Sequence, residues 1–171
     1  MLHGDGVTLR EWRESDLEAL AALRNDVGLQ TLLMAQAKPN SVDRVRAWLT
    51  DRSNRSDMVF FVIADTAEDS VLGYLQVADI NSFQGHGDLG ICLSPTAHGR
   101  DLAREACTLL EQYLREILSL RKLTLKVLTD NARAIAFYRK HGYRDVGVLE
   151  QHFRSGENYF DVLIMERQLV V

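Results

Sequence analysis

Residues 90–106 read GICLSPTAHGRDLAREA, and this stretch decides the fold of the 171-residue chain. The apolar run DLGICL, from Asp88, is typical of a strand, and Pro95 ends it. A helix begins near Gly99 and follows one apolar face as far as Ile117. Unpaired N–H groups and partial positive charge at that helix start predict a site for phosphate oxygens. The alternative is an ordinary loop with a solvent-exposed glycine.

Two helices are expected in the first third of the chain. After a short strand at 7–10, Ser15 and Glu18 form a capping-box pattern that opens a helix, and this helix should fray near Gly28. Ser41 is placed to cap a second helix, which follows the break at Pro39.

The remaining segments add strands and one short helix. The runs VFFVIA from Val59 and VLGYLQVAD from Val71 predict a hairpin. KLTLKVL from Lys122 predicts a strand, and NARAIAFYRKHG from Asn131 predicts a short helix closed by Gly142. YRDVGVL and NYFDVLIMERQL complete the order β-α-α-β-β-β-α-β-α-β-β. This order favours one mixed, mostly antiparallel twisted sheet with helices on both faces, an α/β fold of the α+β type.

Length and composition favour one globular domain over residues 1–171, with 46% hydrophobic and 26% charged residues. Neither sign of charge forms a long block, which argues against a nucleic-acid partner, and the net charge of -4 slightly favours a cationic substrate. No leader-like start and no run of ~20 apolar residues occurs, so we expect a cytoplasmic protein without a membrane partner. Cys92 and Cys107 lack metal-ligand spacing; we expect both to be buried and reduced, and no metal site.

A second informative stretch is NARAIAFYRKHGY. Asn131 and Tyr138 lie seven residues apart, about two helical turns, so both side chains could touch one ligand. The alternative is that Asn131 caps the helix while Phe137 and Tyr138 are core aromatics.

Together these stretches resemble the acetyl-CoA-binding half of the GNAT superfamily of N-acetyltransferases. The more specific motif is N-x-x-A-x-x-x-Y-x-K-x-G-Y, which matches here at Asn131, Ala134, Tyr138, Lys140, Gly142 and Tyr143. The beginning, VTLREWRESDLEALAALRND, and the ending, GVLEQHFRSGENYFDVLIMERQL, resemble the branch of ribosomal-protein alanine, spermidine and aminosugar-nucleotide acetyltransferases. The resemblance covers nearly the whole chain, and it implies a GNAT-like acyl-CoA N-acyltransferase fold with acetyl-CoA as cosubstrate.

The phosphate turn departs from the family pattern Arg/Gln-x-x-Gly-x-Gly/Ala. Here His98 stands in place of Arg or Gln, and Asp101 stands in place of glycine. A carboxylate there would repel a bound pyrophosphate, although Arg100 and Arg104 are near enough in sequence to offset it. The resemblance assigns acetyl-CoA binding to Ile91, Cys92, Leu93, His98, Gly99, Arg100, Asp101, Leu102, Ala103, Arg104, Asn131, Ala134, Phe137, Tyr138 and Lys140.

Catalytic roles also follow from the resemblance. An alkyl ammonium must lose a proton before it attacks a thioester, and the family's carboxylate position corresponds to Asp88. The backbone of residues 91–93 would pair with the pantetheine arm and polarise the thioester carbonyl. Tyr138 would protonate the departing thiolate. For Asp88 the alternative is a strand-edge aspartate that faces water.

The acceptor is expected to be a primary amine of a small molecule, such as an aminosugar nucleotide or a polyamine, that attacks the thioester directly. By similarity its groove would include Arg24, Asn25, Glu150 and His152, each of which could instead be an exposed polar residue. Acetylation of a protein N-terminus and a non-catalytic acyl-CoA-binding domain stay open as alternatives, as does the choice between a monomer and a homodimer.

Overall fold

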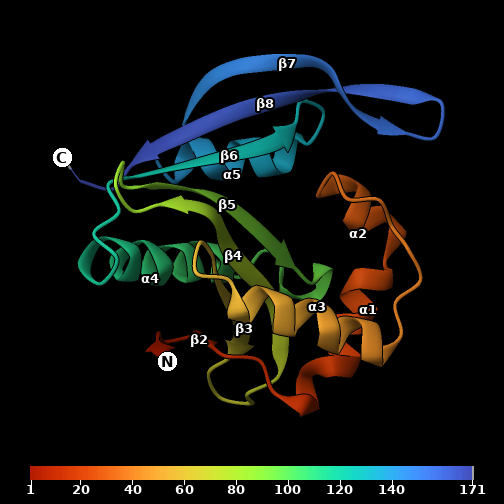
Figure 1. Cartoon of the computed structure of the whole chain (residues 1–171), viewed down its shortest axis with the longest axis vertical. Helices are drawn as coiled ribbons and strands as arrows, with labels where there is room; N and C mark the ends of the chain where they lie inside the picture. Colours follow the sequence, from red (N-terminus) through yellow and green to blue (C-terminus); the bar gives the residue numbers. More distant parts are fainter. Residues whose placement is uncertain (171) are drawn as a thin grey trace.

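In the computed structural model, which describes residues 1–170, one eight-stranded sheet runs through the molecule (Figure 1). Its order is β1-β2-β3-β4-β5-β6-β8-β7, and only β5 and β6 are parallel neighbours. The strands are β1 (Leu2–His3), β2 (Val7–Arg10), β3 (Val59–Asp65), β4 (Val71–Asn81), β5 (His86–Leu93), β6 (Lys122–Leu128), β7 (Arg144–Ser155) and β8 (Asn158–Gln168). The predicted mixed, mostly antiparallel sheet is confirmed.

Helices cover both faces of this sheet, as predicted. The helices are η1 (Glu14–Asp16), α1 (Leu17–Asn25), α2 (Val27–Leu32), α3 (Val42–Asn54), η2 (Pro95–Ala97), α4 (Leu102–Glu116) and α5 (Ala132–Lys140). One core cluster packs α4 and α5 against the sheet, with Leu110 fully buried, and the other packs α1 and α3, with Leu20 and Leu49 fully buried. Because side chains alternate along a strand, Leu75 enters the first cluster and Tyr74 the second.

The helix starts agree only partly with the sequence prediction. Ser41 caps α3, because its Oγ accepts a hydrogen bond from the backbone N–H of Arg44 at 3.2 Å. The predicted capping box at Ser15 and Glu18 is wrong. Asp16 makes the capping hydrogen bond instead: its Oδ2 accepts from the backbone N–H of Arg13 at 2.8 Å. The short 3-10 helix η1 precedes α1 at this point.

The fraying expected near Gly28 is also wrong. Helix α1 ends at Asn25, and Gly28 lies inside the second short helix, α2. Asp26 makes this possible, because its Oδ1 accepts a hydrogen bond from the backbone N–H of Leu29 at 2.9 Å and so caps α2. The chain thus turns twice in a short distance and places α2 near one end of the strands (Figure 1).

The parallel strands β5 and β6 separate after a short paired region. Their register joins His86–Asp88 to 122–124 and goes no further. Beyond it, β5 stays paired with β4 as far as Leu93, while β6 stays paired with β8 as far as Leu128. Figure 1 shows the two strands diverging toward their C-terminal ends. Backbone groups on the β6 side of residues 89–93 therefore have no strand partner, and they form one wall of a slot.

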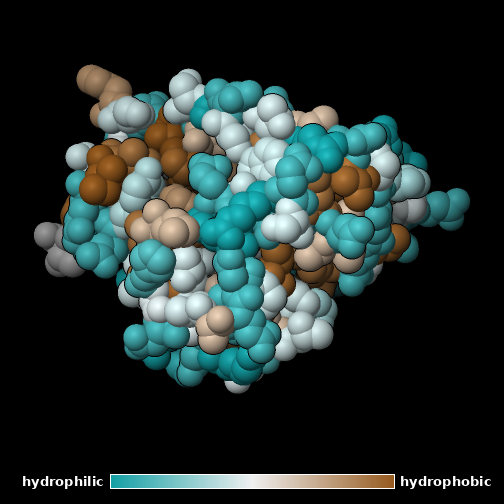
Figure 2. Space-filling model, turned by 90° about the horizontal axis from the view of Figure 1, so that it is seen from below, coloured by the Kyte–Doolittle hydropathy of each residue, from teal (hydrophilic) through white to brown (hydrophobic). Residues whose placement is uncertain are grey.

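Both cysteines agree with expectation, because Cys92 and Cys107 are free and buried. Burial raises the pKa of the Cys92 thiol to about 11 and that of Cys107 to about 12, so both remain protonated thiols near neutral pH. On the side of the molecule shown in Figure 2, apolar patches alternate with hydrophilic ones. Within residues 1–170, none of the helices has the length and apolar character that a membrane span requires.

Candidate active site

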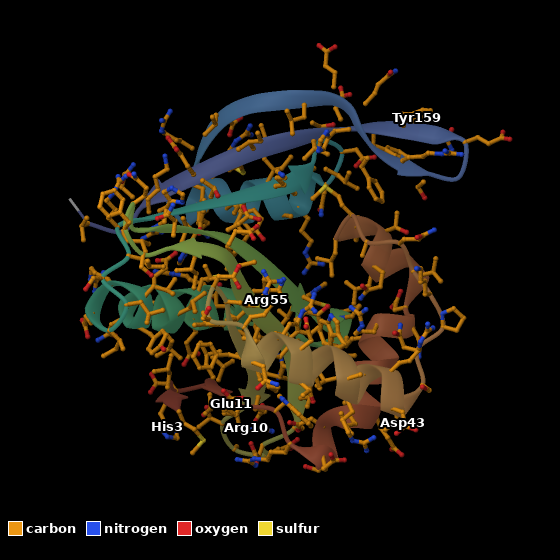
Figure 3. The ribbon with its side chains drawn as sticks, in the orientation of Figure 1. His3, Arg10, Glu11, Asp43, Arg55 and Tyr159 are labelled. Atoms are coloured by element: carbon orange, nitrogen blue, oxygen red, sulfur yellow. The ribbon has the colours of Figure 1, made fainter. Side chains whose placement is uncertain are left out.

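A cavity of about 800 Å³ occupies the slot between the separating strands. Its walls come from α2, β4, β5, β6 and β7, from the turn that precedes α4, and from α5. In Figure 1 the hairpin of β7 and β8 extends above α2, and Figure 3 places Tyr159 on that hairpin. His152 and Phe153 of β7 line the same cavity as Leu29 of α2, so these distant segments close one end of it.

The turn before α4 forms the other end of the cavity. Gly99 has a φ of 80°, and a Cβ built there would meet no atom within 4 Å, so backbone can approach a ligand closely. Asp101 is the N-cap of α4 in a left-handed conformation, with φ at 56°. The first N–H groups of α4 have no intrahelical partners, which makes this end suited to phosphate oxygens.

Most residues assigned to acetyl-CoA by resemblance line this cavity. The lining contains Ile91, Cys92, Leu93, His98, Gly99, Asp101, Leu102, Ala103, Arg104, Asn131, Ala134, Phe137 and Tyr138. Arg100 and Lys140 are exposed and lie outside the lining. The Nε2 of His98 lies 3.2 Å from the carbonyl oxygen of Leu93, so this imidazole braces the turn against the end of β5.

The helix α5 contributes Asn131 and Tyr138 in different ways. Asn131 caps the helix, because its Oδ1 accepts a hydrogen bond from the backbone N–H of Ala134 at 3.2 Å. Tyr138 is 8% exposed and lines the cavity, and burial raises the pKa of its hydroxyl. A phenol with a raised pKa is protonated at neutral pH, so it can donate a proton to an anion that forms beside it.

Asp88 lies in the cavity wall at the point where β5 and β6 part. Its Oδ1 accepts a hydrogen bond from Thr124 Oγ1 at 3.0 Å. Burial raises the pKa of Asp88, while the Thr124 hydrogen bond and the positive charge of Lys126 oppose that rise. A carboxylate with a raised pKa is a better proton acceptor than an exposed aspartate.

The four residues expected in the acceptor groove are placed differently from one another. His152 lines the cavity, whereas Arg24, Asn25 and Glu150 lie outside its lining. Asn25 holds the loop before α3: its Nδ2 donates to the carbonyl oxygen of Asn40 at 3.0 Å, and its Oδ1 accepts from the N–H of Asn40 at 2.8 Å. Glu150 is exposed on β7.

Sequence reasoning missed the apolar wall that α2 provides. Leu29, Leu32, Leu33 and Met34 line the cavity, together with Gln76, Lys126 and Phe153 from the sheet. The leucines recur at helical spacing, and this pattern could have revealed α2. Gly28 hides this pattern, because glycine is a poor helix former and indicates the end of a helix.

Comparison with models of protein families identifies the family of this chain. The model of the acetyltransferase (GNAT) domain matches residues 7–144, which include the diverging strands, the turn before α4 and helix α5. The chain belongs to the GNAT acetyltransferases.

Curated relatives align with this GNAT protein over most of both chains. It is 24% identical over 156 residues to a spermidine N(1)-acetyltransferase of Vibrio cholerae, covering 91% of this chain and 89% of the relative. It is 26% identical over 159 residues to a spermidine N(1)-acetyltransferase of Escherichia coli K12, covering 93% and 84%. Among solved structures, spermidine N-acetyltransferase from Vibrio cholerae in complex with CoA and spermine matches with a TM-score of 0.88, 24% identity and 96% coverage of both chains.

The protein is therefore an acetyl-CoA-dependent N-acetyltransferase, with acetyl-CoA as cosubstrate. The cavity fits that molecule in two respects. The slot offers unpaired backbone groups to an extended amide-containing arm, and the turn before α4 offers N–H groups to a pyrophosphate. Asp101 is the N-cap of α4 at this end, and we expect its carboxylate to oppose the second of these contacts.

Proposed function

We propose that this GNAT protein transfers the acetyl group of acetyl-CoA directly to the primary amine of a small molecule. The observation that carries the proposal is one continuous cavity whose lining includes Asp88, the slot of residues 91–93 and Tyr138. A proton acceptor, a set of backbone donors and a proton donor thus share one site. This is the set that amine attack on a thioester requires.

Each protein group has one task in this proposal. Asp88 takes the proton that the amine must lose, and the free amine nitrogen then bonds to the thioester carbonyl carbon. Backbone N–H groups of residues 91–93 stabilise the negative charge that the carbonyl oxygen gains. When the carbon–sulfur bond breaks, Tyr138 gives its hydroxyl proton to the thiolate. The second proton, which the nitrogen loses as it becomes an amide, restores the Tyr138 hydroxyl, so only the proton on Asp88 remains to be released to solvent.

The relatives support a small-molecule acceptor. Both curated relatives are named as spermidine acetyltransferases, and their lengths match this chain. Polyamines are therefore one acceptor class to test, and aminosugar nucleotides are the second because the same branch of the family includes enzymes that use them.

The test is release of free CoA from acetyl-CoA in the presence of a panel of primary amines. The panel contains spermidine, an aminosugar nucleotide, glucosamine, glucosamine 6-phosphate, leucine, leucinamide and a peptide with a free N-terminal alanine. We expect release that depends on a small amine and falls at least about 100-fold in Tyr138→Phe.

Two other results would contradict the proposal. Tight acetyl-CoA binding without turnover of any panel member would indicate an acyl-CoA-binding domain. Turnover confined to the peptide would indicate N-terminal acetylation of proteins.

A further inference from the structure

The end of the cavity at Asp88, where the acceptor amine is proposed to bind, is called the acceptor end. It has few negative charges for an enzyme whose relatives are named as spermidine acetyltransferases. Among the lining residues within 1–170, the carboxylates are Asp88 and Asp101, and Asp101 lies at the opposite end, at the start of α4. Lys126 also lines the cavity, and its positive charge acts on Asp88. Within the lining, the acceptor end thus has one carboxylate, which the reaction uses as a base, and one ammonium group. The exposed Asp79 lies outside the lining, although its charge also acts on Asp88.

Arg24 and Arg52 add positive charge behind the acceptor end of the cavity. The guanidinium carbons of Arg24 and Arg52 lie 4.1 Å and 4.4 Å from the ring centroid of Trp48. Arg52 Nε donates a hydrogen bond at 3.1 Å to the Oε1 of Gln76, whose side chain lines the cavity. Burial, together with the charge of Arg24, lowers the pKa of Arg52, which is a sign that these two cations are close and poorly compensated.

Few acids neutralise this pair. Among residues 1–170, Arg24 Nε has no hydrogen-bond partner although it is buried, and the carboxylate nearest to Arg52 is that of exposed Asp51, at 4.0 Å. Other arginines of the same region are well paired: Arg55, labelled in Figure 3, forms a salt bridge of 2.9 Å with Asp57. The positive charge is therefore concentrated beneath the acceptor end.

This charge discriminates between classes of amine. A polyamine would bring several ammonium groups into a pocket that has Lys126 in its wall and Arg52 behind Gln76, and its distal charges would stay unpaired. An amine with an anionic group would instead place that group near these cations. Leu29 and Leu32 of α2, with Leu33 and Met34 directly after it, give the cavity an apolar wall that suits an apolar body in the acceptor.

We propose that the acceptor is a primary amine that also carries a carboxylate or a phosphate, with its amine at Asp88 and its anionic group at Lys126 and the Gln76–Arg52 pair. The inference rests on the proposed function and narrows its substrate class. It also differs from what the net charge of -4 favours, because the local charge of the cavity decides binding while the overall charge is spread over the surface.

The first experiment compares matched pairs of amines. Glucosamine 6-phosphate is compared with glucosamine, and leucine with leucinamide, so that each pair differs in its anionic group; spermidine represents the polycations. We expect kcat/KM to be at least about 10-fold higher for the anionic member of one pair, and lowest for spermidine. The pair that shows the difference tells phosphate from carboxylate.

The second experiment changes the cavity's cation. Lys126→Met keeps an unbranched side chain one atom shorter and removes its charge, and Lys126 is exposed, so the fold should tolerate the change. We expect the advantage of the anionic amine to fall about 10-fold, with the KM for acetyl-CoA unchanged. Lys38→Met is the matched control, because Lys38 is also exposed but lies outside the cavity lining, and it should keep the preference.

Binding of the same amines to the CoA-loaded protein is measured by calorimetry, so the inference is tested even if no amine is turned over. Tighter binding of the anionic member of a pair, reduced in Lys126→Met, supports the inference. Equal binding of both members, or spermidine as the best substrate or ligand, overturns it. In that last case amine-dependent CoA release would still uphold the proposed function, so the two failures are distinguishable.

Discussion

Asp101 is the N-cap of helix α4, at a position where the GNAT turn pattern has glycine, and its φ of 56° is in the left-handed region. Its side chain is exposed and lines the phosphate end of the cavity. Two substitutions separate its backbone role from its charge. Asp101→Asn removes the charge and keeps a residue that tolerates left-handed backbone, whereas Asp101→Gly removes both the charge and the Cβ.

The size of the charge effect follows from Coulomb's law. A carboxylate about 6 Å from each of two phosphate charges in water costs ~1.4 kcal/mol of binding free energy, or about tenfold in the dissociation constant. At 0.15 M salt the Debye length is about 8 Å, so screening cuts this cost roughly by half, to about threefold. The backbone effect on stability is small, because the ~1 kcal/mol strain relieved by glycine is offset by its extra freedom in the unfolded chain.

The assay is titration of CoA into the natural protein and both variants at 0.02 M and 0.15 M salt. We expect both variants to bind CoA about three times more tightly at 0.15 M, and the gain to grow toward tenfold at the lower salt concentration. Tighter binding in Asp101→Gly alone would assign the effect to the Cβ. Unchanged or weaker binding in both variants would refute the electrostatic reasoning and mean that Asp101 has a positive role.

Three further predictions concern the reaction and the core. Tyr138→Phe should lower kcat by about 100-fold with little change in the KM for acetyl-CoA, whereas full turnover in a stably folded variant would remove Tyr138 from the mechanism. Because Thr124 opposes the rise in the pKa of Asp88, Thr124→Val should raise that pKa further and move the acid limb of the kcat/KM profile to higher pH. Asp88→Asn should abolish that limb, since the active form of the base is deprotonated; an unmoved limb in both variants would exclude Asp88. The hydroxyl of Tyr143 is buried and has no hydrogen-bond partner in the part of the chain that the structure describes, so Tyr143→Phe should raise the free energy of unfolding in urea by about 1 kcal/mol. A decrease would show that the hydroxyl is satisfied.

Local patterns were enough to predict the sheet and most of its helices. Ser41 caps α3 and Asn131 caps α5 through short-range hydrogen bonds, so the sequence itself encodes these starts. Helix α2 was missed because its start depends on Asp26 and its stability on packing beside the sheet, while Gly28 suggested a break.

The parts of the site that depend on distant segments could not be predicted. The slot exists because β6 keeps its register with β8 while β5 keeps its register with β4, and no single strand pattern contains that information. Likewise, Arg24, Trp48 and Arg52 come from two helices, and only the packed structure shows that both guanidinium groups share one ring. The family and its cosubstrate could be predicted because two contiguous motifs carry the resemblance.

The slot between β5 and β6 has a consequence for how such an enzyme can diversify. Its walls offer main-chain groups, which every residue except proline supplies alike, so the donor-handling half of the site places weak demands on side-chain identity. Part of the acceptor wall comes from other segments, namely α2 and the edge strand β7. Substitutions in these segments can therefore change which amine binds while the slot for acetyl-CoA stays the same. Proteins that share this fold can thus come to differ in their acceptors through changes in a few segments.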